Sequence, residues 1–267
     1  MSSTTSVAAP HAGAVGNKLE YADLEKRFGG VQVFRHVSFA VPTGTITALI
    51  GPNGAGKTTL INMSCGVFHA DGGTMTKDGR SLATIKPAQA LGLGIARTFQ
   101  DVRLFPTMTV LENVMVAFPQ QPGDQPWNLF ARGWRTAEDA NRAEALALLE
   151  RLGLGADAER RAEDIPFGSQ KLVGLARAAA TGADTLMLDE TTTGLAISRV
   201  PTVLAFLRGL KADGRTILLI EHNMDVVADV ADQVVVLHGT VIASGTPQQV
   251  LHDPQVIKDY LGRIYDA

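Results

Sequence analysis

The feature that most constrains the fold is a glycine-rich segment, residues 51–58, with the sequence GPNGAGKT. It follows the apolar run ITALI at 46–50 and precedes TLINM, which is typical of the opening of a helix. A glycine-rich loop between a strand and a helix lets several N–H groups point into one concavity at a helix N-terminus, where anions bind. The spacing GxxxxGK[ST] therefore predicts a phosphate-binding loop.

The residues of this loop have separate expected roles in nucleotide binding. Lys57 is expected to reach the β- and γ-phosphates, and the hydroxyl of Thr58 to take one coordination position on Mg²⁺. The alternative is a glycine-rich turn that carries a lysine by chance, and the flanking strand and helix disfavour it. The residues expected to surround the phosphates are Gly51, Asn53, Gly54, Gly56, Lys57, Thr58 and Thr59.

Length and composition indicate a globular chain of one large or two modest domains. It has 267 residues, of which 45% are apolar, enough for a substantial core. No apolar run approaches the roughly 18 residues that span a bilayer, and residues 1–16 lack the basic flank and apolar centre of a signal peptide. Cys65 is the only cysteine, so its expected role is packing. These features predict a cytosolic protein.

The distribution of charge argues against a nucleic-acid partner. The formal net charge is −3, and basic residues are interspersed with acidic ones, as in ERRAE at 159–163. Binding to nucleic acid usually requires basic residues gathered on one face. No nucleic-acid partner is therefore expected.

The rest of the chain predicts alternating strands and helices after a β-rich start. Residues 1–17 have no apolar face and are expected to form a disordered tail, and the runs 19–28 and 31–41 predict an antiparallel hairpin. Alternation of strands with helices implies an α/β fold with a mostly parallel sheet, functional groups lying at the carboxyl ends of the strands. Helices are expected over 57–66, 110–117, 138–152, 169–181 and 199–212, and strands over 46–50, 91–98, 185–188, 216–220, 233–237 and 241–243.

The middle of the chain carries three local expectations. Thr109 and Glu112 have the spacing of a capping box, and Glu138 and Arg142 are spaced for an i,i+4 ion pair. The segment 119–133 is expected to be largely loop. Its aromatic residues suggest either a contact surface or packing onto the domain's own flank.

A pair of acidic residues, Asp189 and Glu190, ends the apolar strand at 185–188. Asp189 is expected to deliver a carboxylate to the Mg²⁺ sphere, often through water, and Glu190 to polarise the attacking water. A carboxylate pair at a strand end is weak evidence alone. It lies, however, downstream of the phosphate loop on a strand that can neighbour it, and together the two features predict an NTPase.

Five segments occur in the order that is found in ATP-binding cassette (ABC) ATPases. They are the loop at 51–59, Gln100 after an apolar strand, the segment around Gly168, LDE at 188–190 and EH at 221–222. The resemblance covers residues 18–262. Three further phrases resemble the ATPases of branched-chain amino acid importers: RTFQDVRLF at 97–105, EHNMD at 221–225 and DPQVI at 253–257.

The resemblance implies a fold and two ligands. The fold is a P-loop NTPase core with a mostly parallel sheet, an N-terminal antiparallel β subdomain and an inserted α-helical subdomain over about 101–182. A single ABC ATPase domain would span 18–262, after the tail at 1–17 and before a short C-terminal end at 263–267. The ligands would be ATP and Mg²⁺.

The resemblance also implies roles for single residues. Phe28 matches the aromatic that stacks on adenine, whereas its position before a glycine turn leaves a core role equally open. Gln100 matches the glutamine that senses Mg²⁺ and the γ-phosphate and relays that state to the membrane subunit. Glu190 matches the catalytic carboxylate, and His222 the histidine that contacts the γ-phosphate. The nucleotide is sandwiched between two such subunits, and Gly168 lies in the signature loop that each offers to its partner.

Two dimer-facing loops depart from the pattern of the family. The signature loop reads IPFGSQ at 165–170, and Pro166 supplies neither a hydroxyl nor an N–H to the partner's γ-phosphate. One lost hydrogen bond to a charged group costs about 1.5–3 kcal/mol. Thr191 stands where proline is usual, and Ala196 where a polar residue is usual. These departures favour a heterodimer with a different ATPase subunit over a homodimer.

The implied function is that of the ATP-hydrolysing subunit of an ABC importer for branched-chain amino acids or related small polar solutes. Its partners would be integral membrane permease subunits, docked in part on the LFP segment at 104–106, and indirectly a solute-binding protein. It would lie peripherally at the cytoplasmic face of the membrane.

Three alternative functions are weighed against this one. A regulatory or weakly hydrolytic ABC subunit, paired with an active ATPase, is the main alternative because of Pro166, Thr191 and Ala196. A GTPase is disfavoured because no Asn-Lys-x-Asp motif follows the loop. An ABC ATPase that acts on ribosomes or DNA is disfavoured because the sequence holds neither a second cassette nor a long coiled-coil insertion.

Overall fold

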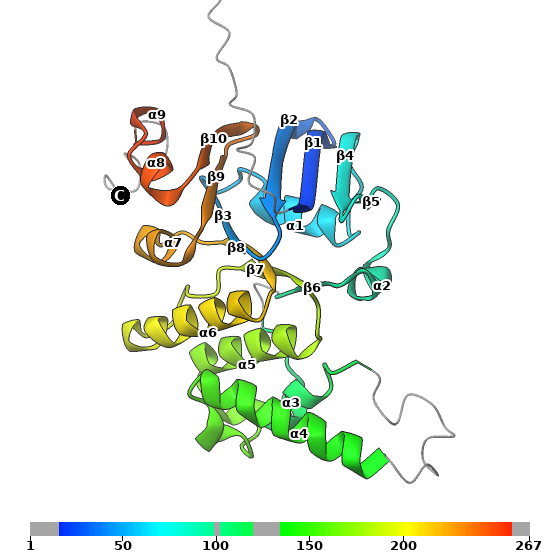
Figure 1. The fold of residues 1–267 in the computed structure, drawn as a ribbon, viewed down its shortest axis with the longest axis vertical. Helices are drawn as coiled ribbons and strands as arrows, with labels where there is room; N and C mark the ends of the chain where they lie inside the picture. The colour runs from blue at the N-terminus through cyan, green and yellow to red at the C-terminus, as the bar shows by residue number, and fades with distance from the viewer. Residues whose placement is uncertain (1–15, 99–101, 120–133, 258–267) are drawn as a thin grey trace, which may run out of the picture.

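The computed structural model describes residues 16–98, 102–119 and 134–257, and in this part of the chain two β-sheets lie above a group of helices (Figure 1). The predicted fold class is confirmed, since an antiparallel sheet and a mostly parallel sheet are both present. Among these residues, no helix is both long enough and apolar enough to cross a membrane.

The first sheet is antiparallel and contains the predicted hairpin. Its strands are, in order, β2 (Val31–Pro42), β1 (Asn17–Phe28), β4 (Gly72–Lys77) and β5 (Arg80–Ser81). β1 begins at Asn17 and turns at Gly29, whose φ of 56° is in the left-handed region that glycine adopts without strain. The buried face of this sheet packs with α1 (Lys57–Ser64) in one apolar cluster.

The second sheet is parallel except at one edge. Its order is β10 (Val241–Gly245), β9 (Gln233–Leu237), β3 (Ile46–Ile50), β8 (Thr216–Ile220), β7 (Thr185–Asp189) and β6 (Ile95–Arg97), and only the pairing of β10 with β9 is antiparallel. β3, β7 and β8 are buried along their whole length, because the sheet is covered on both faces. Burial on both faces explains why their sequences are nearly continuous apolar runs.

The strand that ends at Asp189 does not neighbour the strand of the phosphate loop, so that expectation is wrong. β8 lies between β3 and β7 and pairs with both. Because all three strands are parallel, their carboxyl ends still lie at the same edge of the sheet. Residues 51–58, 189–190 and 221–222 follow these three ends.

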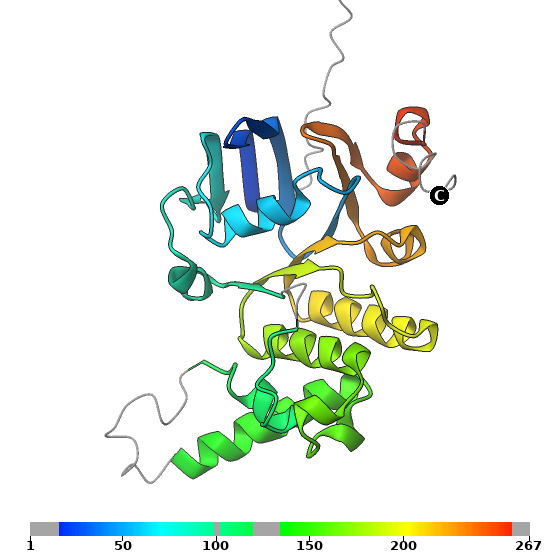
Figure 2. The same ribbon diagram turned by 180° about the vertical axis from the view of Figure 1, so that it is seen from behind.

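Four helices, α3 (Val110–Met115), α4 (Trp134–Arg151), α5 (Phe167–Ala180) and α6 (Val200–Ala212), form a layer below the parallel sheet (Figure 2). Apolar side chains of α3, α4, α5 and α6 belong to one cluster with those of β7 and β8. The helical region is therefore continuous with the core that supports the site. The helices are α1 and α2 (Pro87–Ala90), α3 (Val110–Met115), α4 (Trp134–Arg151), α5 (Phe167–Ala180), α6 (Val200–Ala212), α7 (Met224–Val230), α8 (Pro247–Leu251) and α9 (Pro254–Val256), with 3-10 turns η1 (Leu91–Leu93), η4 (Gly155–Asp157), η5 (Ala162–Asp164) and η6 (Ile197–Arg199).

Three local expectations are corrected by the structure. The strand expected over 91–98 is reduced to β6, because η1 and the left-handed Gly94, with a φ of 76°, occupy its first half. α4 begins at Trp134, before the expected start. Arg142 is paired with Glu159 at 2.6 Å and not with Glu138, since the chain after α4 folds back beside it. The capping box of Thr109 and Glu112 is confirmed at α3. The segment 119–133 lies almost wholly outside the described residues.

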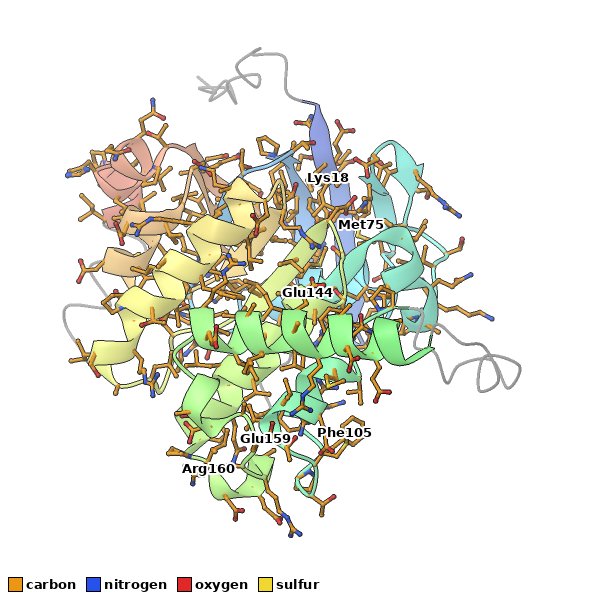
Figure 3. The ribbon with its side chains drawn as sticks, turned by 60° about the horizontal axis from the view of Figure 1, so that its bottom comes forward. Lys18, Met75, Phe105, Glu144, Glu159 and Arg160 are labelled. Carbon is orange, nitrogen blue, oxygen red and sulfur yellow. The ribbon has the colours of Figure 1, made fainter. Side chains whose placement is uncertain are left out.

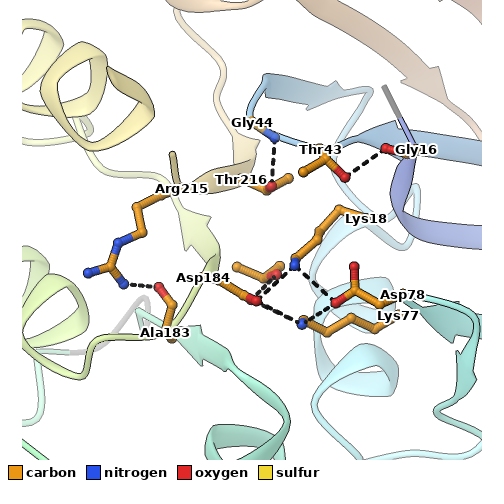
Figure 4. A network of polar contacts seen from close by, with 11 residues as sticks. Gly16, Lys18, Thr43, Gly44, Lys77, Asp78, Ala183, Asp184, Arg215 and Thr216 are labelled. Atoms are coloured by element: carbon orange, nitrogen blue, oxygen red, sulfur yellow. Dashed lines mark hydrogen bonds and ion pairs between the residues drawn. The ribbon is translucent and has the colours of Figure 1, made fainter. Parts of the chain in front are cut away.

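Four charged residues join the two sheets (Figure 4). Lys18 of β1 lies 2.9 Å from Asp78 and 2.8 Å from Asp184, and Lys77 of β4 lies 2.8 Å from Asp78 and 3.0 Å from Asp184. Asp184 immediately precedes β7, so these pairs cross from the antiparallel to the parallel sheet. Burial disfavours the ionised form of Asp184, but the hydrogen bonds from Lys18 and Lys77 outweigh it and hold its pKa below the ordinary value.

Replacing Asp184 with asparagine is expected to lower the free energy of unfolding at pH 7 by about 1–2 kcal/mol, or roughly 3–6 °C in Tm. Two nearly buried ammonium groups would then share one carboxylate. Because the pKa of Asp184 is lower in the folded than in the unfolded chain, its contribution is complete above the unfolded pKa of about 3.9 and is lost as the pH falls through the folded pKa. Thermal unfolding at pH 7 and below pH 4 measures both effects.

The matched control is Asp229→Asn, which removes one partner of the exposed ion pair between Asp229 and Arg208. Exposed pairs contribute about 0–1 kcal/mol, so its Tm should change by less than about 3 °C. Equal changes in Tm for the two variants would contradict a stabilising link between the sheets.

Candidate functional site

The phosphate loop connects β3 to α1 in the predicted way. Gly51, Gly54 and Gly56 have φ values of 154°, 81° and 94°, all in the region that favours glycine. A Cβ on Gly51 would collide with the backbone carbonyl of Leu237, whereas the space beside Gly54 is open. Gly56 gives α1 an N-cap without a side-chain hydrogen bond, so the first N–H groups of the helix remain available to a ligand.

Lys57 lies folded over the loop. Its Nζ donates to the backbone oxygens of Gly51 at 2.7 Å and Pro52 at 2.9 Å. Burial lowers the pKa of the Lys57 ammonium, and the carboxylates of Asp189 and Glu190 oppose that effect. The Lys57 ammonium is thus held at the concavity by uncharged carbonyl groups. A phosphate that binds there can replace these carbonyls as the hydrogen-bond partner of Lys57.

Thr58 and Asp189 bring together oxygen donors from two distant parts of the chain. The hydroxyl of Thr58, in the first turn of α1, donates to Oδ2 of Asp189 at 3.1 Å. Burial raises the pKa of Asp189, and the hydrogen bond from Thr58 opposes this. Mg²⁺ prefers hydroxyl, carboxylate and water oxygens, so the donor set fits that ion.

Glu190 and His222 meet at the same edge of the sheet. Oε1 of Glu190 lies 3.2 Å from Nε2 of His222. Glu190 has a φ of 52°, unusual for a residue with a side chain, and its N–H donates to the carbonyl of Ile220 at 2.9 Å. A carboxylate and an imidazole held together at a phosphate site can orient and deprotonate a water molecule.

Glu221 is a residue whose role the sequence analysis missed. It is 1% exposed, and its Oε1 accepts hydrogen bonds from the hydroxyls of Thr191 at 3.1 Å and Thr192 at 2.9 Å, and from the N–H of Thr192 at 2.9 Å. Thr191, treated as a departure from the family, therefore has a defined partner. An acidic residue between a buried strand and His222 was the signal available in the sequence, since a buried carboxylate needs donors.

Three other residues predicted to bind the nucleotide are described by the structure: Phe28, Asn53 and Thr59. Phe28 ends β1 with 41% of its surface exposed, its ring 5.0 Å edge-on from that of Phe68, and Nζ of Lys26 lies 5.1 Å from its centre. Asn53 is exposed, and Thr59 is half-buried in α1. Gln100 lies outside the described residues.

The signature loop, residues 165–170, leads into α5 in the helical region. Among the described residues, its contacts are with the loop that follows β7 and not with the phosphate loop. Pro166 is the N-cap of α5 without a side-chain hydrogen bond. A Cβ on Gly168 would lie 3.3 Å from Leu195, in the loop that follows β7. Lys171 donates to the carbonyl of Thr193 at 2.8 Å, which joins α5 to that loop. Ile197, beside Ala196, is 90% exposed.

A cavity of about 210 Å³ opens beside the two carboxylates. Its lining includes Asp189, Glu190, Leu104 and residues of α5, Arg177 among them. The strand ends and the helical region therefore share one opening.

Comparison with protein families gives two matches. The family described as ABC transporter matches residues 34–193, and the family described as branched-chain amino acid ATP-binding cassette transporter matches residues 240–266. A relative from Salmonella typhimurium, the high-affinity branched-chain amino acid transport ATP-binding protein LivG, is 40% identical over 90% of this chain and 95% of its own length. A probable LivG from Methanocaldococcus jannaschii is 35% identical over 91% of this chain and 97% of its own.

Solved structures resemble the chain over most of its length. A nucleotide-free ATP-binding cassette from an ABC transporter aligns with a TM-score of 0.76 and 33% identity, covering 92% of this chain and 99% of its own. An ATP-binding cassette in its ADP conformation aligns with a TM-score of 0.78 and 34% identity over the same shares. Sequence and fold thus agree with the phosphate loop and the acidic strand end, and this chain belongs to the ABC transporter family of ATP-binding cassette proteins.

Proposed function

We propose that this chain is the ATP-hydrolysing subunit of an importer for branched-chain amino acids or related small polar solutes. The observation that carries the proposal is the meeting of Glu190 and His222, 3.2 Å apart, at the sheet edge that also holds the phosphate loop. The solute class is supported by relatives whose names describe branched-chain amino acid transport.

In this proposal, the chain binds ATP between the phosphate loop and Phe28. The N–H groups of the loop and the ammonium of Lys57 hold the phosphates, while the open part of the Phe28 ring stacks on adenine. Thr58 and Asp189 would hold Mg²⁺, together with Gln100. When bound, Mg²⁺ would neutralise charge on the phosphates.

The chemistry requires a positioned water and a stabilised γ-phosphate. Glu190 orients the attacking water and accepts its proton. His222 keeps Glu190 in place through its Nε2, and we assign its ring the contact with the γ-phosphate that the resemblance to ABC ATPases implies. The residues thus act mainly by position and charge, which is the usual basis of catalysis of phosphoryl transfer.

The site needs a second ATPase subunit to be complete. Gly168 and the uncapped start of α5 lie against the loop after β7, not against this chain's own phosphate loop, so we assign them to the partner's site. The apolar Ile197 is exposed in the same region. Pro166 and Ala196 support a different partner subunit rather than a second copy of this chain.

The assembly would lie at the cytoplasmic face of the membrane. Integral permease subunits would hold the ATPase pair there, and a solute-binding protein would act on them from the other side. A mainly regulatory role is not favoured, because Glu190 and His222 are both present and in contact, and because Thr191 has its own hydrogen-bond partner.

Glu190→Gln is expected to reduce ATP hydrolysis by at least about 100-fold, because the amide cannot accept the proton of water. Nucleotide binding should persist, since the loop is untouched. Phosphate release by the assembled transporter measures the first effect, and a fluorescent ATP analogue the second. Glu144→Gln on the exposed face of α4 is the matched control (Figure 3) and should hydrolyse ATP at the wild-type rate.

Retained hydrolysis in Glu190→Gln would refute the catalytic role.

The same assay of ATP hydrolysis tests whether the chain pairs with a different ATPase subunit. The chain should hydrolyse ATP faster with a second ATPase subunit that carries a standard signature loop than alone, and an equal rate for the chain alone would contradict the heterodimer.

Phe28→Ala is expected to raise the KM for ATP about 5- to 150-fold, because one aromatic stacking contact is worth about 1–3 kcal/mol. The kcat should change little, since Phe28 lies apart from the reacting atoms. Phe28→Tyr keeps the ring and should behave as the wild type. Steady-state hydrolysis over a range of ATP concentrations separates the two parameters, and an unchanged KM in Phe28→Ala would rule out stacking.

The docking of permease subunits is expected to involve Leu104 and Phe105. Asn113, fully buried in α3, accepts from the N–H of Phe105 at 2.8 Å and donates to its carbonyl at 3.0 Å, while the Phe105 side chain stays 49% exposed at the edge of the helical region (Figure 3). The backbone is therefore fixed, and the ring, which has the Arg177 guanidinium 5.5 Å from its centre, keeps half of its surface exposed to a partner.

Leu104→Glu and Phe105→Glu are expected to abolish co-purification with the permease subunits, because a charge would be buried at the contact. The Tm of Phe105→Glu should stay close to the wild-type value because its ring is 49% exposed, whereas Leu104→Glu should lower the Tm because Leu104 packs against the helical core. Leu91→Glu, which changes an apolar residue of similar exposure (46%) in η1, is the control and should still assemble. Normal assembly of both docking variants would refute this surface.

A further inference from the structure

The carboxylate of Glu221 is buried and fully engaged. Besides the three bonds to Oε1 from Thr191 and Thr192, its Oε2 accepts from the N–H of His222 at 3.3 Å. No ion pair to Glu221 occurs among the described residues. A buried carboxylate without a cation is stabilised by its hydrogen bonds alone. Loss of any of these four donors would therefore destabilise the buried charge.

These contacts connect the two segments that carry the catalytic pair. Thr191 and Thr192 directly follow Glu190, and Glu221 directly precedes His222. On the other side, the N–H of Glu190 donates to the carbonyl of Ile220 at 2.9 Å. The segments 190–192 and 220–222 are therefore tied on both sides of the contact between Glu190 and His222.

The backbone of Glu190 needs such ties. Its φ of 52° is in the left-handed region, which a residue with a Cβ occupies only where its surroundings hold it. The two residues directly after it, Thr191 and Thr192, are held by their hydroxyls and one N–H, which converge on Oε1 of Glu221. Lys171 holds the loop one residue further on, at the carbonyl of Thr193. Loss of this acceptor would release the backbone directly behind the catalytic carboxylate.

We propose that Glu221 is a positioning residue for ATP hydrolysis, which acts through Thr191 and Thr192 to hold Glu190 against His222. The expected effect on hydrolysis rests on the proposed function, whereas the hydrogen bonds of Glu221 do not. We assign Glu221 no contact with the nucleotide, because its carboxylate already accepts four hydrogen bonds, from Thr191, Thr192 and His222. A purely structural anchor would instead affect stability and nucleotide binding together.

The test compares variants of the full-length chain in the assembled transporter. Thr191→Val removes one donor at nearly constant volume and should lower kcat about 3- to 10-fold, and Glu221→Ala should lower it about 10- to 100-fold, with the KM for ATP changed less than about 3-fold. Thr191→Ser restores the hydroxyl and should bring kcat back to within about 2-fold of the wild type.

The matched control is Thr47→Val in β3. Thr47 is buried, and its hydroxyl has no hydrogen-bond partner in the described part of the chain, so the same substitution removes no tie and should leave kcat unchanged. An unchanged kcat in Thr191→Val, a failure of Thr191→Ser to restore it, or an equal loss in Thr47→Val would each overturn the proposal.

Hydrogen–deuterium exchange gives a readout that does not need hydrolysis. The peptide that contains residues 189–196 should exchange at least about 10-fold faster in Glu221→Ala than in the wild type, because the N–H of Thr192 loses its acceptor. Unchanged exchange would refute the tie. A wild-type chain that does not hydrolyse ATP would instead refute the proposed function, while the exchange would still decide whether Glu221 holds this segment.

Discussion

The parallel pairing of β3 with β8, and of β8 with β7, is the constraint on which the site depends. It brings three strand ends, which are distant in the sequence, to one edge of a sheet whose strands are fully buried. The phosphate loop, the carboxylates of Asp189 and Glu190, and His222 all follow these ends. Apolar burial on both faces of the sheet therefore fixes the relative positions of charged groups that could not be buried by themselves.

Two connections keep the remainder of the chain in a fixed relation to that edge. At the opposite end of β7, the pairs of Lys18 and Lys77 with Asp184 hold the antiparallel sheet, which carries Phe28. On the helical side, α5 shares a core with β7 and β8. Lys171 also ties α5 to the loop after β7. The regions assigned to adenine stacking, to permease docking and to the partner subunit are thus all connected to β7.

The sequence predicted most of this arrangement where local pattern and local structure agree. The glycine loop, the hairpin and the capping box at Thr109 depend on neighbouring residues and are confirmed. Strand order depends on pairing between distant segments, so the interposed β8 could not be read from spacing. For the same reason Arg142 was assigned a helical partner, although the chain folds back to offer Glu159.

The site shows the same division between local and long-range information. The loop spacing predicted roles for Lys57 and Thr58 and a strand end predicted roles for Asp189 and Glu190, whereas the role of His222 was implied only by the resemblance to ABC ATPases. No pattern in the sequence indicates that Thr191 and Thr192 converge on Glu221, because those contacts exist only once β7 and β8 lie side by side.

Thr191 shows why a departure from a family pattern need not mean a weakened site. A proline would fix the backbone after Glu190 through its own ring. Threonine leaves that backbone freer but adds a hydroxyl, and here the hydroxyl is bonded to a carboxylate on the neighbouring strand. The constraint has moved from the covalent structure of one residue to a hydrogen bond between two strands, so the geometry of Glu190 now depends on the same strand pairing that assembles the rest of the site.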